Sequence, residues 1–103
     1  MKVIQVCGSM KFVREMMEIS EKLELQGNIV LMPIYNLSRA NKDAFTKEEI
    51  LVLDKMHKER IKLSDAILVV NVDGYIGNGT KSEIEFAQSL NKEIIYYTDL
   101  EDR

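Results

Sequence analysis

The segment from Ala66 to Val72 (AILVVNV) constrains the fold more than any other part of the chain, because every residue in it except Asn71 is apolar. A strand of this composition is usually buried on both faces, as in a parallel sheet that helices cover on each side. A glycine-rich loop and an amphipathic helix, expected from Thr80 to Leu90, follow it directly. The segment therefore predicts an α/β domain.

Strands and helices alternate along the rest of the chain. The β-rich and helical-period patterns predict three more strands and two more helices: Lys2 to Cys7, Asn28 to Met32 and Glu93 to Tyr97, with helices from Met10 to Leu25 and from Thr46 to about Leu63. Thr46 and Glu49 have the spacing of a capping box. Right-handed crossovers then give a small doubly wound parallel sheet in the order 2-1-3-4, a three-layer sandwich of the flavodoxin or Rossmann kind.

Composition bounds the function. The chain has 103 residues, which predicts a single domain over 1–103, and it has 46% hydrophobic residues, 30% charged residues and a net charge of -3. No basic patch favours nucleic acid as a partner, and no apolar run or signal peptide favours a membrane. A single cysteine makes no internal disulfide, so we expect a cytoplasmic protein. One histidine and one cysteine without ligand spacing predict no metal, and no cofactor is implied.

The run from Gly77 to Ala87 (GNGTKSEIEFA) has two interpretations. Its glycines point backbone N–H groups outward at a helix N-terminus, where anions bind, and Glu83 follows within the expected first turn. Alternatively, Thr80 caps the helix and Glu83 completes a capping box. The predicted topology favours the first interpretation, because ligands bind where strands 1 and 3 meet, beyond their carboxyl ends.

The same topology names the candidate contacts. Glu83 is expected to point into the crevice between the two loops that follow strands 1 and 3. The residues expected to bind a small molecule there are Cys7, Gly8, Ser9, Met10 and Lys11 from the first loop, and Asn71, Asp73, Tyr75, Gly77, Gly79 and Thr80 from the third.

Three runs occur in the order of known family motifs: Cys7 to Lys11 (CGSMK), Ser64 to Val70 (SDAILVV) and Gly79 to Ile84 (GTKSEI). Together they resemble the nucleoside 2-deoxyribosyltransferase superfamily, particularly its branch of 2′-deoxynucleoside 5′-monophosphate N-hydrolases. The resemblance covers nearly the whole chain in element order. It implies that the substrate is a nucleoside or nucleotide, and that a homodimer or higher homo-oligomer completes the site.

The resemblance also implies individual roles. Glu83 matches the catalytic carboxylate that attacks the anomeric carbon or stabilises its positive charge as the base leaves. Ser9 and the backbone at Gly8 would hold the phosphate or sugar, and Gly79 and Thr80 would hold the same end from the other side.

Several positions depart from the family pattern. A tyrosine that supports the carboxylate is Gln5 here, a glycine after the catalytic motif is Glu85, and an aspartate of the transferases is Gly77. Tyr75 could replace the missing phenol. A further family aspartate is His57, which could still donate a proton to a leaving base.

These departures leave alternatives open. A lone helical histidine is commonly a surface or packing group, and Cys7 is commonly a small packed hydrophobe. The fold could equally be a nucleotide-binding module that does not turn its ligand over, or an interaction domain with an empty crevice. We further expect the loop from Ile34 to Phe45, with Tyr35 and Arg39, to cover the nucleobase, and the tail from Thr98 to Arg103 to be frayed.

Overall fold

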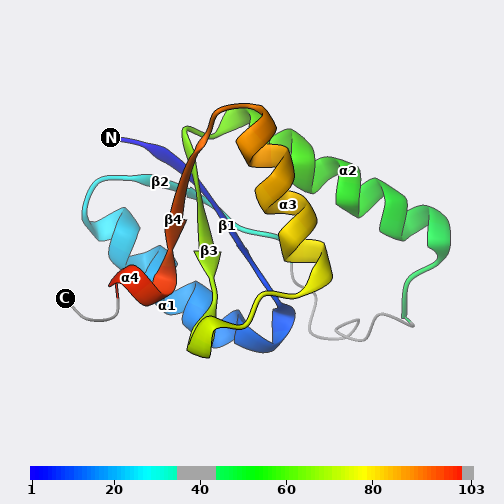
Figure 1. Cartoon of the computed structure of the whole chain (residues 1–103), viewed down its shortest axis with the longest axis horizontal. Coiled ribbons are helices and arrows are strands. Elements are labelled where there is room, and N and C mark those ends of the chain that lie inside the picture. The colour runs from blue at the N-terminus through cyan, green and yellow to red at the C-terminus, as the bar shows by residue number, and fades with distance from the viewer. Residues whose placement is uncertain (35–43, 101–103) are drawn as a thin grey trace.

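A computed structural model describes residues 1–34 and 44–100 (Figure 1). Its sheet has four parallel strands in the order β2-β1-β3-β4, which confirms the predicted topology. The strands are β1 (Val3–Gly8), β2 (Ile29–Leu31), β3 (Ala66–Val70) and β4 (Glu93–Tyr96). Most of the loop expected to cover a nucleobase, including Tyr35 and Arg39, lies outside the described residues.

Helices cover both faces of the sheet. The α-helices are α1 (Val13–Leu25), α2 (Lys47–Leu63), α3 (Asn78–Ser89) and α4 (Tyr97–Leu100), and two short 3₁₀ helices are η1 (Met10–Phe12) and η4 (Val72–Gly74). Figure 1 shows α1 and α4 on one side of the sheet, with α2 and α3 on the other. In the described residues, no helix is both long and apolar enough to cross a membrane.

Alternation along the strands divides the core into two layers. Ile4 and Val6 of β1 pack with Met16 and Ile19 of α1 on one face. Cys7, at the next position of β1, instead packs on the α2 and α3 face, with a second apolar cluster. All five residues of β3 are buried, as its apolar sequence predicts. The face on which each side chain of β1 points therefore decides which helices it meets.

The two helix starts differ in how well the sequence predicts them. The capping box at α2 is confirmed, because Glu49 N–H donates to Thr46 Oγ1 at 3.1 Å and Thr46 N–H donates to Glu49 Oε1 at 2.9 Å. The alternative interpretation of the second start, a capping box at Thr80, is wrong. Gly77 is the N-cap of α3, and Lys81 N–H donates to its carbonyl at 3.0 Å. Thr80 lies inside the first turn and is buried.

The expectation of a frayed tail is wrong for Thr98 to Leu100, which belong to α4 together with Tyr97, the residue expected to end the last strand. Asn71 holds this helix against the end of β3, since its amide donates to Thr98 Oγ1 and its carbonyl oxygen accepts from Thr98 N–H, each at 3.2 Å. Tyr97 and Leu100 also pack against the α1 layer of the core. Residues 101–103 lie outside the described range.

Candidate active site

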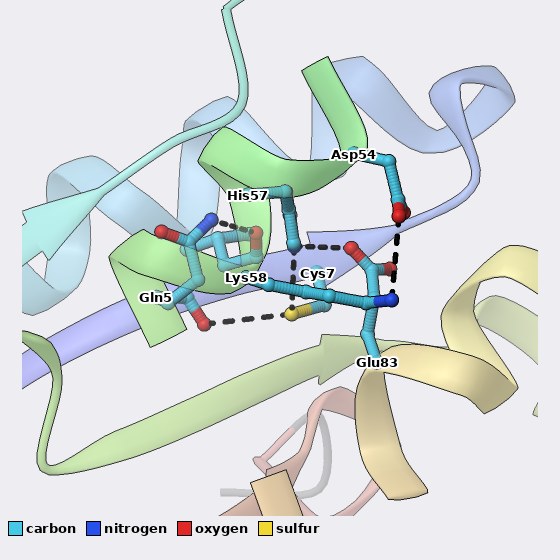
Figure 2. A network of polar contacts seen from close by, with 7 residues as sticks. Gln5, Cys7, Asp54, His57, Lys58 and Glu83 are labelled. Atoms are coloured by element: carbon cyan, nitrogen blue, oxygen red, sulfur yellow. Dashed lines mark hydrogen bonds and ion pairs between the residues drawn. The ribbon is translucent and has the colours of Figure 1, made fainter. Parts of the chain in front are cut away.

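Three side chains from three different elements meet near the carboxyl end of β1. Cys7 comes from β1, His57 from α2 and Glu83 from α3, and Figure 2 shows all three pointing toward one another. His57 Nε2 contacts Glu83 Oε2 directly, and it lies 3.5 Å from Cys7 Sγ. The structure thus brings together the two residues predicted to be catalytic and one that was predicted to bind substrate.

The fold explains why these three residues meet. Cys7 pairs in register with Val69 of β3, one residue before the end of each strand's described pairing, and faces the α2 and α3 layer. His57 lies on the buried side of α2. Because α3 begins at Asn78, Glu83 is in its second turn and not in its first. The His57 and Glu83 side chains are only 11% and 15% exposed, so their contact is largely shielded from water.

The surroundings keep the Cys7 thiol neutral. Burial raises the pKa of Cys7 well above its ordinary value, and the negative charge of Glu83 raises it further. The positive charge of Arg60, on α2, acts in the opposite direction and is the smaller influence. Cys7 is therefore no ready nucleophile at neutral pH, because the thiolate is the reactive form.

This raised pKa predicts a loss of stability at alkaline pH. Above about pH 9 the unfolded chain loses its thiol proton while the folded chain keeps it, so the free energy of unfolding falls as pH rises, by about 1.4 kcal/mol per pH unit. Cys7→Ala removes the thiol and should show a shallower decline. Urea unfolding of both chains from pH 7 to 10.5 measures the difference, and identical pH dependence in the two chains would contradict the assignment.

Asp54 and Gln5 lie next to the cluster of Cys7, His57 and Glu83, but their side chains contact groups outside it. Asp54 pairs with Lys58 along α2 at 3.3 Å, as their i,i+4 spacing allows. Gln5 is fully buried beside Cys7 on β1, and its amide nitrogen donates to the Val6 carbonyl at 2.9 Å. Its amide oxygen is buried and has no hydrogen-bond partner among the described residues. Glu83 therefore has His57 as its partner, and of the Gln5 amide only the nitrogen is bonded to the strand (Figure 2).

The first loop packs closely against the end of β3. A Cβ added at Gly8 would lie 3.1 Å from the Val70 carbonyl oxygen and 3.3 Å from Val70 Cβ, so a side chain there would push the two strands apart. Ser9 caps η1 by accepting from Lys11 N–H. Met10 is exposed.

An aromatic pair links the two loops. The rings of Phe12 and Tyr75 meet edge to face with centres 5.9 Å apart, and Lys11 Nζ lies 3.4 Å from the centre of the Tyr75 ring. The neighbours of Tyr75 are thus Lys11 and Phe12. The neighbour of Glu83 is His57 (Figure 2), which occupies the place beside the carboxylate where a supporting phenol was expected. Phe12 was not singled out from the sequence, and only its position next to Lys11 could have suggested it.

The other predicted contacts of the third loop fall into two groups. Asn71 is buried and uses both ends of its amide on Thr98, while Asp73 is exposed in a left-handed turn with φ 54°. Gly77 and Gly79 lie at the N-terminus of α3, and a Cβ at Gly79 would meet only open space. The first N–H groups of that helix have no intrahelical acceptor, which leaves them available to an anion.

The site is therefore a shielded carboxylate and imidazole beside a helix N-terminus, at the carboxyl ends of the two central strands. No protein-family model matches the chain, and no curated protein sequence matches it.

Proposed function

We propose that this protein cleaves or transfers the N-glycosidic bond of a nucleoside or nucleoside 5′-monophosphate, with Glu83 as nucleophile. The observation that carries the proposal is the contact between Glu83 and His57, shielded from water beside the free N-terminus of α3. A carboxylate held in this way can trap or stabilise an oxocarbenium-like sugar. The sequence motifs that resemble deoxyribosyltransferases support the same assignment.

In the proposed reaction, a Glu83 oxygen forms a bond to the anomeric carbon of the sugar as the bond from that carbon to the base breaks. The electron pair goes to the base, which takes up a proton from solvent as it leaves. In hydrolysis water then attacks the anomeric carbon, the bond from that carbon to Glu83 breaks, Glu83 returns to its carboxylate form and the water proton passes to solvent. In transfer a second base attacks the same carbon and displaces Glu83 in the same way. His57 holds Glu83 Oε2 and so directs the other carboxylate oxygen at the sugar. It thereby takes over the supporting role of the tyrosine that Gln5 replaces.

The phosphate or sugar hydroxyls would bind at the N-terminus of α3. Two features support this placement: the uncapped N–H groups around Gly79, and the nearby Lys11 ammonium, which lies over the Tyr75 ring. Backbone N–H groups at a helix start favour anions through both hydrogen bonds and the helix dipole. The preference for a monophosphate over a nucleoside is therefore expected to depend on this loop.

Chromatographic detection of free base tests the proposal. The purified chain is incubated with nucleosides and nucleoside 5′-monophosphates, each in ribo and deoxy form, with and without a second base as acceptor. Release of base alone indicates hydrolysis, and exchange of base indicates transfer. Recovery of every nucleoside and nucleotide intact, by a folded chain, would rule out the proposed activity.

A second candidate is a nucleotide-binding module without turnover. It is favoured by the departures from the family pattern: Gln5 in place of the supporting tyrosine, and Gly77 and His57 in place of the two aspartates. This candidate predicts stoichiometric retention of a nucleotide that is recovered unchanged. Equilibrium dialysis with the same panel of compounds separates it from the enzyme.

We further propose that α2 mediates a homo-oligomer. Its N-terminal half extends away from the body of the protein in Figure 1 and exposes five neighbouring apolar side chains, Ile50, Leu51, Val52, Leu53 and Met56. These consecutive side chains are distributed around the helix, and exposed apolar surface of this kind marks protein interaction sites. A second copy of the chain, presenting the same helix, would bury both surfaces at once.

Charged substitutions on the apolar surface of α2 test this assembly. We expect sedimentation equilibrium to give at least a dimer mass for the wild type and a monomer mass for Leu51→Lys combined with Val52→Glu, because both side chains are more than half exposed in one copy. Lys47→Glu, which changes charge on the same helix without altering its apolar residues, is the control. A monomeric wild type would contradict the proposed assembly.

A further inference from the structure

The cluster of Cys7, His57 and Glu83 brings three different metal-ligand atoms to one point. A thiol sulfur, an imidazole nitrogen and a carboxylate oxygen lie within 4.8 Å of one another. From this geometry we propose that the three side chains form a binding site for a Zn²⁺ ion. The site does not depend on the proposed glycosidase activity.

The spacing of the donors suits tetrahedral zinc. Zinc bonds of about 2.3 Å to sulfur and about 2.0–2.1 Å to nitrogen place the two donors about 3.5 Å apart in a tetrahedron. Cys7 Sγ and His57 Nε2 lie 3.5 Å apart. Glu83 contacts the same nitrogen, so an ion would enter between the imidazole and the carboxylate. The carboxylate can withdraw to admit it, because it is at the end of a flexible side chain.

The donor set selects zinc over the commoner cations. Mg²⁺ and Ca²⁺ prefer sites made of oxygen ligands, whereas a set of sulfur, nitrogen and oxygen suits Zn²⁺ and its spectroscopic substitute Co²⁺. As the ion binds, the Cys7 thiol releases its proton to solvent, and the resulting thiolate and the Glu83 carboxylate together neutralise the two positive charges of the ion. Cys7 is fully buried and His57 nearly so. The burial of these two ligands also favours an ion that loses its bound water readily.

The support of the ligands is rigid. They belong to β1, α2 and α3, elements that pack against one another through the second apolar cluster. Three protein ligands leave the fourth position of a tetrahedral ion to water or to a small molecule. An ion in this position would also take the Glu83 oxygens away from any sugar. Zinc binding and attack by Glu83 are therefore mutually exclusive, and zinc should inhibit base release reversibly.

Cobalt titration of the full chain tests the site directly. After treatment with a chelator and its removal, Co²⁺ is added and the absorption spectrum recorded. We expect one equivalent to give a near-ultraviolet thiolate-to-metal band and intense visible bands of tetrahedral Co²⁺, all abolished by one equivalent of Zn²⁺. Cys7→Ser should lose the near-ultraviolet band.

Variants of the other two ligands separate a built site from a lone thiol. His57→Asn and Glu83→Gln should each weaken Co²⁺ binding by more than about tenfold, the lower end of the loss seen when only a hydrogen-bond partner of a ligand is removed. Glu85→Gln, on the exposed side of α3, is the matched control and should bind as the wild type does. Circular dichroism verifies that each variant is folded.

Two outcomes would overturn the proposal: no thiolate band in the wild type, or equal Co²⁺ affinity in wild type, His57→Asn and Glu83→Gln. If Cys7→Ser fails to fold, the other two variants still decide the question. The readout is absorption and not activity, so a chain that binds Co²⁺ without releasing base would retain the zinc site and lose the glycosidase proposal. A chain that releases base without binding Co²⁺ would retain the glycosidase proposal and lose the zinc site.

Discussion

Glu83→Gln is expected to lower kcat for base release by roughly 10³- to 10⁶-fold, equivalent to about 4–8 kcal/mol of transition-state stabilisation. An amide has nearly the shape of the carboxylate, so the substitution preserves the packing between α2 and α3. In the proposed reaction it removes the negative charge that would stabilise the oxocarbenium-like sugar and the oxygen that would bond to it. KM should change little, because the proposed substrate would bind mainly through its phosphate, sugar hydroxyls and base.

The control for this variant is Glu85→Gln, two residues further along α3. Glu85 is exposed and faces away from the buried side of the helix, so its substitution removes the same charge from the same element. It should leave kcat within about twofold of wild type, as surface substitutions usually do. A Glu83→Gln chain that released base within tenfold of the wild-type rate would remove Glu83 from the role of nucleophile.

Much of the fold could be predicted because a few segments leave little choice. Ala66 to Val72 is almost entirely apolar and rich in β-branched residues, which favours a strand buried on both faces, with parallel neighbours and covering helices. The strand itself ends at Val70, because Val72 begins η4. The capping box at Thr46 was also predictable, since the interaction is local. The start of α3 was not. Threonine is a residue type that favours the N-cap position. Tertiary packing nevertheless buries Thr80 in the first turn of α3, and Gly77 is the N-cap.

The candidate site was predictable in its members more than in its geometry. Glu83 was placed in the crevice by the predicted topology and given its catalytic role by resemblance to a family. His57 was singled out by that resemblance alone, and Cys7 was placed at the same end of the sheet. Their mutual contact could not be predicted, because they lie far apart in sequence and meet only when α2 and α3 share the face of β1 on which Cys7 lies. The sequence indicates the period of a strand, but not which helices cover each of its faces.

The predicted contacts of the third loop also depend on packing between distant parts of the chain. Asn71, Asp73 and Tyr75 follow a strand that ends where ligands bind, so all three were candidates. In the structure the Asn71 amide is hydrogen-bonded to Thr98, which belongs to a tail with no predicted structure. The Tyr75 ring packs against Phe12 and Lys11. Polar residues at the end of a strand thus have competing structural partners that local sequence does not reveal.

His57→Ala is expected to lower kcat by about 10²-fold with a much smaller change in KM, the loss that misplacement of a reacting group by about 1 Å can cause. The imidazole holds Glu83 Oε2, so its loss leaves a shielded carboxylate without that contact and free to turn away from the sugar. Asp54→Ala is the control, because Asp54 is on the same helix, is about half exposed and pairs only locally with Lys58.

Added imidazole distinguishes positioning by His57 from mere packing. The truncated side chain leaves a space of the shape of imidazole next to Glu83, so millimolar imidazole should restore part of the lost kcat in His57→Ala and have no effect on wild type or Asp54→Ala. A packing defect would show instead as a lowered thermal midpoint that imidazole does not raise together with activity. Loss of kcat without rescue, in a variant as stable as wild type, would mean that His57 acts through some contact other than the one it makes with Glu83.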